Sequence, residues 1–200
     1  MMTADQDPFA RFVEWFAEAE AGEPNDPNAM TLATLSKDGP TARIVLLKGL
    51  DDADRGADRG FVFYTNTQSR KGRDIAGHDQ VCLLFHWKSL GRQVRIEGPA
   101  VRVDDAEADA YYASRPRGSR IGAWASLQSQ RLPDRATLET RVAEMEAAYP
   151  DDAVPRPPHW TGYRVTPRLI EFWQDGAFRL HDRLVYARAG DGWTTERLYP

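Results

Sequence analysis

The stretch AMTLATLSKDGPTARIVLLKGL, residues 29–50, decides the fold class of this chain. Two runs of apolar and β-branched residues flank KDGP (37–40), and Asp-Gly between such runs is a strong hairpin signal. The stretch therefore predicts two antiparallel strands joined by a tight turn. In RIVLLK (43–48), four apolar residues separate Arg43 from Lys48. That spacing predicts a buried strand with one cation at each end.

Strand patterns recur on both sides of a helical middle. One amphipathic helix is predicted at about 7–20, with Asp7 as N-cap and apolar residues at helical spacing (Phe9, Phe12, Val13, Phe16). A short helix is predicted to start near Ser69, and a helical insert spans about 104–149. The further strands are FVFYT (61–65), QVCLLFHW (80–87), RQVRIEGPAVRV (92–103), GYRVTP (162–167), RLIEFWQ (168–174), FRLHDRLVYAR (178–188) and WTTERLYP (193–200).

This order of elements indicates a fold that is mainly β with α. Strands, then helices, then strands with short links predict an antiparallel, Greek-key-like barrel with helices packed outside. Two hundred residues suit a single domain, 1–200. Gly98-Pro99 interrupts one predicted strand, which suggests a bulge or a sheet edge at that point.

Composition excludes several classes of protein. The chain is 42% hydrophobic and 28% charged, so it can form a folded core. Its net charge of −4 argues against a general nucleic-acid binder. The single cysteine, Cys82, cannot form an internal disulfide, and no apolar run is long enough for a membrane span. The four histidines show no ligand spacing. We therefore expect a cytoplasmic protein without a metal site.

Cations recur beside predicted strand ends. Besides Arg43 and Lys48, these are Arg70, Lys71, Arg115, Arg117, Arg179 and Arg183. In SRK (69–71), a serine precedes two cations at a predicted helix start, where backbone N–H groups and the helix dipole favour a phosphate. An ordinary capped helix is the alternative reading of the same three residues.

The pentapeptide RLHDR, residues 179–183, raises a similar choice. In a strand, Arg179, His181 and Arg183 share one face, while Asp182 points the other way toward a structural salt bridge. The shared face is either solvated or turned toward an anion or an aromatic ring. The sequence has no Gly-x-Gly-x-x-Gly, no Walker motif and no Gly-x-Ser-x-Gly elbow. Clustered cations and aromatics without a nucleophile favour binding of phosphorylated aromatic molecules, with chemistry supplied by a cofactor.

An ordered set of motifs supports the second choice. RIVLLK, FYTNTQSRK, RQVRIEG, SRPRGSRIGAWAS followed by QS, IEFWQ and RLHDR occur in this order. Together they resemble the pyridoxamine 5′-phosphate oxidases, from about Met30 to the terminal RLYP. The resemblance implies a split β-barrel that binds flavin mononucleotide (FMN) and works as a homodimer with two sites at the subunit interface. It also implies oxidation of pyridoxine or pyridoxamine 5′-phosphate by O2, which yields pyridoxal 5′-phosphate and H2O2.

The resemblance assigns roles residue by residue. The residues expected to hold FMN, some of them from the second subunit, are Arg43, Ile44, Val45, Leu46, Leu47, Lys48, Tyr64, Thr65, Arg70, Lys71, Gln93, Gln128, Ser129, Trp173 and Arg183. The residues expected to grip the substrate phosphate are Lys48, Tyr111, Arg115 and Ser119. Arg179 and His181 match the pair that covers the pyridine ring, and they are the candidate catalytic residues.

Two departures and two rival functions accompany the resemblance. Only MMTADQD (1–7) precedes the first helix, where the family often has a longer basic segment that closes over the site. The acidic loop GLDDADRGADRG (49–60) is longer than usual.

The rivals are a related flavin oxidase that acts on another compound, such as a phenazine precursor, and a non-catalytic FMN-binding protein. Of the three functions, only oxidation of pyridoxine or pyridoxamine 5′-phosphate uses the complete phosphate set together with Arg179 and His181.

Overall fold

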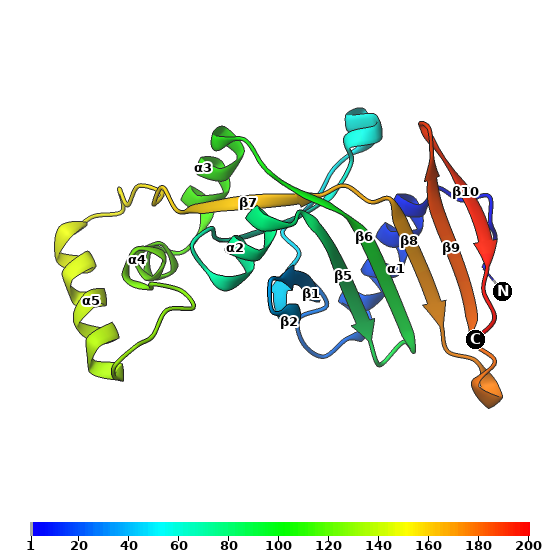
Figure 1. The fold of residues 1–200 in the computed structure, drawn as a ribbon, viewed down its shortest axis with the longest axis horizontal. Helices are drawn as coiled ribbons and strands as arrows, with labels where there is room; N and C mark the ends of the chain where they lie inside the picture. The colour runs from blue at the N-terminus through cyan, green and yellow to red at the C-terminus, as the bar shows by residue number, and fades with distance from the viewer. Residues whose placement is uncertain (1) are drawn as a thin grey trace.

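The computed structural model describes residues 2–200; Met1, the first residue of the predicted domain, lies outside them. In this range an antiparallel sheet of ten strands curls into a half-barrel, as the sequence predicts (Figure 1). Helices contribute about as many residues as strands. The strands are β1 Ala29–Ser36, β2 Gly39–Leu46, β3 Gly49–Leu50, β4 Phe61–Asn66, β5 Gln80–Trp87, β6 Arg92–Arg102, β7 Trp160–Val165, β8 Leu169–Gln174, β9 Asp182–Ala189 and β10 Gly192–Arg197.

The predicted hairpin is confirmed, but the predicted burial of its second strand is wrong. β1 and β2 pair from Ala29↔Leu46 to Ser36↔Gly39, and Gly39 has φ +115°, a value that favours glycine. β2 lies at the end of the strand order, and alternate residues along it are exposed. Ile44 is 62% exposed and Leu46 is 38% exposed.

β6 joins the two parts of the sheet. Its residues 92–97 pair with β8, and its residues 100–102 pair with β7. The change of partner falls at Gly98-Pro99, where a Cβ on Gly98 would lie 2.0 Å from the carbonyl oxygen of Thr166. The predicted bulge or edge is therefore wrong: β6 lies inside the sheet, and glycine permits a close approach at its corner.

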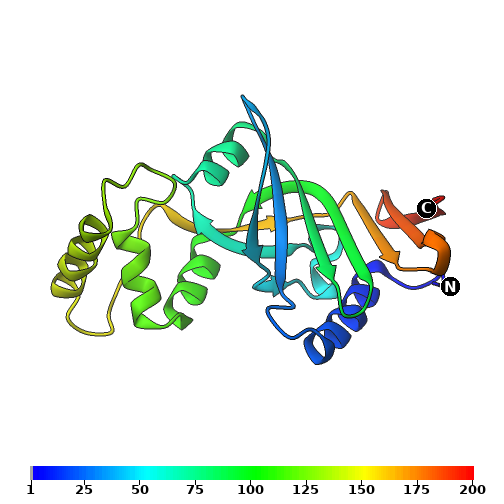
Figure 2. The ribbon, with the colours of Figure 1, turned by 90° about the horizontal axis from the view of Figure 1, so that it is seen from below.

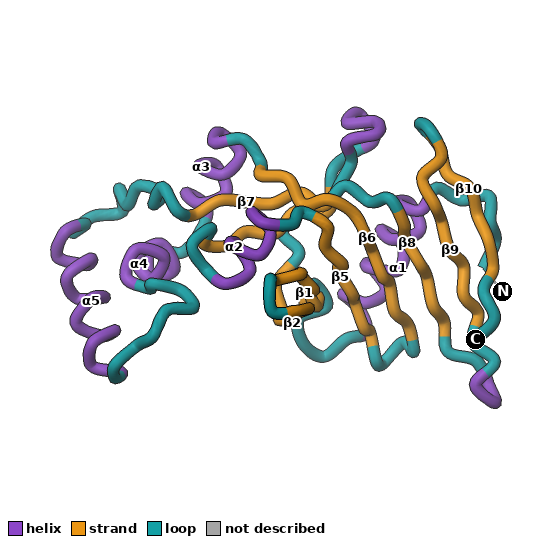
Figure 3. The backbone as a smooth tube through the Cα atoms, viewed as in Figure 1, coloured by secondary structure: helices purple, strands orange, loops and turns teal. Residues whose placement is uncertain are grey.

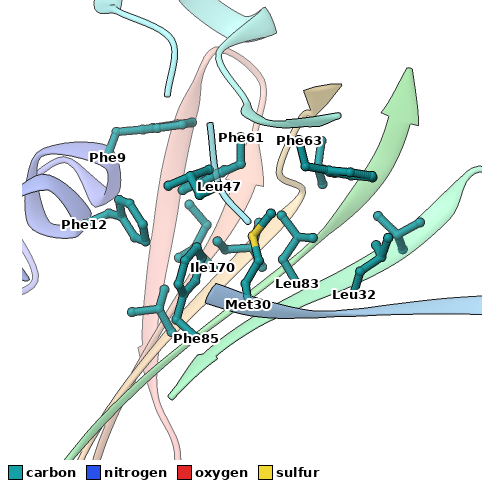
Figure 4. Close-up of a cluster of buried hydrophobic side chains, with 14 of the residues drawn as sticks. Phe9, Phe12, Met30, Leu32, Leu47, Phe61, Phe63, Leu83, Phe85 and Ile170 are labelled. Carbon is teal, nitrogen blue, oxygen red and sulfur yellow. The ribbon is translucent and has the colours of Figure 1, made fainter. Parts of the chain in front are cut away.

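Helix α1 (Pro8–Gly22) packs against the sheet and closes the core. Figure 4 shows Phe9 and Phe12 beside Phe61 of β4 and Phe85 of β5; the Phe12–Phe61 ring centroids are 4.9 Å apart. The side chain of Asp7 accepts hydrogen bonds from the Phe9 and Ala10 amides and caps the helix, as predicted. Val13, predicted on the apolar face, is 52% exposed.

The remaining α-helices gather beside β7, at the end of the molecule away from β10 (Figures 1 and 2). They are α2 Arg70–Gly77, α3 Asp105–Ser114, α4 Arg117–Ala125 and α5 Arg135–Ala148; two short 3₁₀ helices span Ala53–Asp58 and Ala177–Arg179. The Ser69 hydroxyl accepts from the Gly72 amide and caps α2, which confirms the predicted helix start. Pro116 separates α3 from α4, so Tyr111 and Ser119 lie on successive helices. Within residues 2–200, no helix combines the length and apolarity that crossing a membrane requires.

Candidate active site

A cavity of about 650 Å³ lies where β2, β4 and β7 meet α3 and α4. This volume is in the range of sites for small ligands and cofactors. The predicted site residues that line it are Ile44, Val45, Leu46, Lys48, Tyr64, Thr65, Lys71, Tyr111, Arg115, Ser119 and Gln128. The structure therefore brings together, in one cavity, residues from both the expected flavin set and the expected phosphate set.

One wall of the cavity is a stack of aromatic rings. The Tyr64 and Tyr111 centroids are 3.9 Å apart at 17°, and those of Tyr64 and Trp160 are 5.2 Å apart at 11°. Burial raises the pKa of Tyr64 to about 12, so its hydroxyl stays protonated at neutral pH. Trp160 was not predicted from the sequence. It follows a Pro-rich connection as the first residue of β7, and a single tryptophan there carries no signal of its own.

Arg115 is a partly buried cation in the wall of the cavity. Its guanidinium carbon lies 4.9 Å from the centroid of Trp160, within cation–π range. Its Nη1 is buried and has no hydrogen-bond partner among residues 2–200. Burial lowers the pKa of Arg115, and the guanidinium remains charged at neutral pH. A buried, unpaired donor on a cation that lines a cavity is an anion-binding feature.

Two further cations, Lys71 and Arg43, lie near the part of the cavity that Thr65 and Gln128 line. Lys71 Nζ is 3.3 Å from Thr65 Oγ1 and 3.2 Å from Gln128 Oε1. Burial, and then the nearby Arg43 cation, lower the pKa of Lys71. Arg43 donates to the hydroxyls of Thr34 and Thr41, 2.6 Å from each. These contacts fix Arg43 at the sheet edge beside Lys71.

Four of the predicted flavin residues, Arg43, Leu47, Arg70 and Ser129, do not line the cavity. Leu47 is buried in the core, and its amide donates to the carbonyl of Asn28. Arg70 is exposed and lines a neighbouring hollow with Arg73 and His78. Ser129 is exposed with φ +68°.

Gln93, Trp173 and Arg183 form a separate cluster on β6, β8 and β9. They line a smaller cavity of about 270 Å³, together with Glu171. The carboxylate of Glu171 accepts from Arg95 at 2.6 Å and from Arg183 at 2.7 Å. Burial alone raises the pKa of Glu171, but the hydrogen bonds from Arg183 and Arg95 outweigh it and hold the pKa below its usual value.

RLHDR does not form the regular strand that the sequence predicts. A short 3₁₀ helix covers Ala177–Arg179, and β9 begins only at Asp182. Phe178 and Arg179 both have left-handed φ values, +58° and +65°. The reason is a tight reversal of the chain between β8 and β9. Because residues 177–181 are not in a strand, the alternation of strand faces does not determine where the Arg179 and His181 side chains point. The predicted structural role of Asp182 is confirmed, because it pairs with Arg197 and accepts from the Met2 amide.

His181 nevertheless joins the second cluster. Its ring centroid lies 4.5 Å from that of Trp173, while the Arg179 side chain is exposed. Figure 3 shows the β8–β9 connection at the end of the molecule opposite α4 and α5. One chain therefore separates the predicted residues into two groups: the cavity beside α3 and α4, and the group Gln93, Trp173, Arg179, His181 and Arg183.

The carboxylate of Glu171 should make the free energy of unfolding depend on pH, and this can be tested. Because its folded-state pKa is depressed, its contribution to stability is present above the pKa of an unfolded glutamate, about 4.3, and is lost as the pH falls through the folded-state value. Glu171→Gln should lower the free energy of unfolding by about 1–3 kcal/mol at neutral pH, since the side chain is only 6% exposed. Denaturant titrations at equal protein concentration should show this gap shrinking below about pH 4.3. A gap that does not change with pH would contradict the assignment.

Two family models match the chain. The model described as "Pyridoxamine 5′-phosphate oxidase" matches residues 16–149, more than half of the chain. The chain belongs to the pyridoxamine 5′-phosphate oxidase family. A second model, described as "Pyridoxine 5′-phosphate oxidase C-terminal dimerisation region", matches residues 160–200. This family assignment confirms the resemblance drawn from the ordered motifs.

Curated members of the pyridoxamine 5′-phosphate oxidase family are similar over nearly the whole chain. The pyridoxine/pyridoxamine 5′-phosphate oxidase of Granulibacter bethesdensis is 62% identical, covering 98% of this chain and 92% of its own. The enzyme of the same name from Rhodospirillum rubrum is 60% identical, covering 98% of both chains. Among solved structures, PhzG from Burkholderia lata, crystallised with tetrahydrophenazine-1-carboxylic acid, has a TM-score of 0.89 at 35% identity over 98% of this chain and 94% of its own. An FMN-binding protein from Nostoc punctiforme shares the fold, with a TM-score of 0.76 at 17% identity over the full length of both chains.

Proposed function

We propose that this protein is an FMN-dependent oxidase of pyridoxine 5′-phosphate and pyridoxamine 5′-phosphate. Oxygen is the electron acceptor, and the products are pyridoxal 5′-phosphate and H2O2; from the amine substrate, water also hydrolyses the imine that forms first and ammonia is released. The observation that carries the proposal is the buried Nη1 of Arg115, which has no partner among the described residues 2–200, in a cavity that Lys48, Tyr111 and Ser119 also line. Family membership and relatives at about 60% identity support the same reaction.

The phosphate set suits a phosphate monoester. Near neutral pH such a group carries almost two negative charges, and Arg and Lys pair with it through charge-assisted hydrogen bonds. Arg115 and Lys48 supply the charge, and the hydroxyls of Tyr111 and Ser119 supply two further donors. An unphosphorylated substrate would leave Arg115 Nη1 buried without a partner, at a cost in binding.

The rest of the cavity fits FMN. Lys71 lines the cavity and offers positive charge for its phosphate, with Arg43, which also pairs with Asp74, close behind it; Tyr64, Thr65 and Gln128 offer ring and polar contacts for its flavin. The backbone of residues 44–47 runs along the sheet edge beside them, and Arg70 begins α2 close by. When bound, FMN would supply the two-electron acceptor for the substrate's C4′ carbon and pass the electrons to O2. The protein itself contributes binding, orientation and a proton acceptor.

We further propose that each site is completed by a second copy of the chain. The matched dimerisation region covers 160–200, the same residues that carry Trp173, Arg179, His181 and Arg183. These residues lie away from the first cavity in their own chain, so they reach a site only in the partner subunit (Figure 3). The exposed apolar side chains of Ile44 and Leu46 suit a sheet edge that a partner covers. In this arrangement the 200 residues act as a single FMN-binding domain.

Arg179 and His181 have the catalytic roles in this assignment. Arg179 would cover the pyridine ring and orient C4′. His181 would accept the proton that leaves the substrate's hydroxyl or amino group as C4′ is oxidised. Arg183, held by Glu171, would contact the flavin together with Trp173 and Gln93.

Trp160 has a role in this site that can be tested. Trp160→Leu removes the ring that packs against the Arg115 guanidinium, so we expect KM for pyridoxine 5′-phosphate to rise about fivefold, the effect of roughly 1 kcal/mol of cation–π energy. Trp160→Phe keeps an aromatic face and should recover most of the loss. Steady-state kinetics of both variants make the comparison. An equal KM in the parent and in Trp160→Leu would show that the ring does not support Arg115.

A comparison of substrates tests the function. The purified protein with added FMN should oxidise pyridoxine 5′-phosphate under air and produce pyridoxal 5′-phosphate and H2O2 in equal amounts. Dephosphorylated pyridoxine should react much more slowly. Similarity to PhzG favours one competing activity, so tetrahydrophenazine-1-carboxylic acid is the third compound to assay. Preference for that compound would support the competing oxidase, and flavin binding without any turnover would support a non-catalytic FMN-binding protein.

A further inference from the structure

His181 has a carboxylate partner that the roles above do not use. Its Nδ1 lies 3.0 Å from Oδ1 of Asp175, the residue that follows β8. On its other side the imidazole packs against the indole of Trp173, with ring centroids 4.5 Å apart. The His181 side chain is only 18% exposed. Two neighbours from one short segment therefore hold this ring in place.

The contacts around Asp175 bear on which ring nitrogen of His181 carries the proton. The Gly176 N–H has hydrogen-bond geometry toward two acceptors, Asp175 Oδ1 at 3.0 Å and His181 Nδ1 at 3.3 Å. An amide N–H prefers the closer, charged acceptor. A hydrogen on Nδ1 could be donated to the same carboxylate, 3.0 Å away, whereas a lone pair on Nδ1 would face the negative charge. These contacts favour the Nδ1–H tautomer, which leaves the lone pair on Nε2.

The backbone is built to keep Asp175 and His181 together. The Asp175 amide donates to the carbonyl of Gly91, at 2.8 Å, and the Leu180 amide donates to Ala177. A Cβ on Gly176 would lie 2.2 Å from the carbonyl oxygen of Leu180, so only glycine permits this closure. The left-handed Phe178 and Arg179 complete the reversal. Strained residues of this kind persist where the surrounding structure fixes them, often at functional sites.

We propose that Asp175 is a positioning residue for His181 in the oxidation reaction. Its carboxylate fixes the Nδ1–H tautomer and the direction of the ring, so Nε2 presents its lone pair to the substrate. As C4′ is oxidised, one of its C–H bonds and the substrate's O–H or N–H bond break and a C=O or C=N bond forms; the proton forms an N–H bond at Nε2, and bound FMN would take up the hydride and pass its two electrons to O2. Asp175 then stabilises the imidazolium. This inference rests on the proposed function.

The tautomer can be measured without any turnover. The FMN-loaded protein, labelled with ¹⁵N-histidine, contains four histidines, and His181→Gln assigns the signal of interest. In its neutral form, the His181 ring should show a protonated Nδ1 and an unprotonated Nε2. Asp175→Ala should move the signal toward the Nε2–H form. An Nε2–H tautomer in the parent, or no change in Asp175→Ala, would overturn the proposal.

Kinetics supply the second measurement. Asp175→Ala should lower kcat for pyridoxine 5′-phosphate about 10- to 100-fold, with FMN retention and KM nearly unchanged. Asp175→Glu should recover part of kcat, because it restores a carboxylate. Asp182→Asn is the matched control: Asp182 adjoins His181 in sequence but pairs with Arg197, so the tautomer should stay as in the parent. Parental kcat in Asp175→Ala would contradict the positioning role. If the parent oxidises no substrate while the tautomer shift is present, the proposed function fails and the Asp175–His181 contact stands.

Discussion

Arg115→Leu is expected to raise KM for pyridoxine 5′-phosphate by about 30-fold to more than 100-fold. The reason is the loss of a buried, charge-assisted pair with the substrate phosphate, worth roughly 2–3 kcal/mol. The FMN absorbance of the purified variant should match that of the parent, because Arg115 belongs to the phosphate set. Steady-state kinetics over a wide substrate range measure the effect.

Arg117→Leu is the matched control for this change. Arg117 lies two residues away, and it donates to the backbone carbonyls of Asp151 and Tyr149. It does not line the cavity, so its KM should stay near that of the parent. Equal effects from Arg115→Leu and Arg117→Leu would mean that general charge, and not a built phosphate site, governs substrate binding.

His181→Ala is expected to lower kcat by about 10²- to 10⁴-fold, the usual contribution of a positioned general base. FMN should remain bound, since His181 is assigned to the substrate side. Arg183→Leu should behave differently and release FMN more readily, because Arg183 is assigned to the flavin. Stopped-flow reduction of bound FMN under anaerobic conditions would separate the chemical step from reoxidation by O2.

His78→Ala is the control for the histidine substitution. His78 follows α2 and belongs to neither group of site residues. Its kcat should equal that of the parent. Near-parental kcat in His181→Ala would show that another group, or solvent, accepts the proton.

The strands and helices could be predicted from local patterns, but two features of the sheet could not. The turn signal KDGP and the caps at Asp7 and Ser69 act within a few residues, so the sequence displays them directly. The burial of RIVLLK depends on what covers the strand, and β2 proved to be an edge strand. The irregular path of 177–181 depends on how closely Gly176 approaches Leu180, a contact that no alternation pattern contains.

The candidate site shows the same division between local and spatial information. The ordered motifs were sufficient to select Lys48, Tyr111, Arg115 and Ser119, and the structure places all four on one cavity. The sequence does not indicate Trp160 and Asp175, because what distinguishes them is their contacts with Arg115 and His181. Such pairings follow from the packing of separate segments and from the shape of one loop, and neither leaves a motif.

Complementation between two impaired variants tests the central claim, a site shared by two subunits, most directly. Arg115→Leu and His181→Ala homodimers are purified separately, unfolded together, refolded with FMN and assayed with pyridoxine 5′-phosphate at a concentration near the parental KM, where each variant alone has little activity. If Arg115 of one subunit and His181 of the other form each site, a hybrid dimer contains one site with both native residues. Random pairing should then restore about one quarter of the parental activity. If both residues belong to the same subunit's site, every site in the hybrid carries one substitution and activity stays at the level of the separate variants. That result would contradict the shared site.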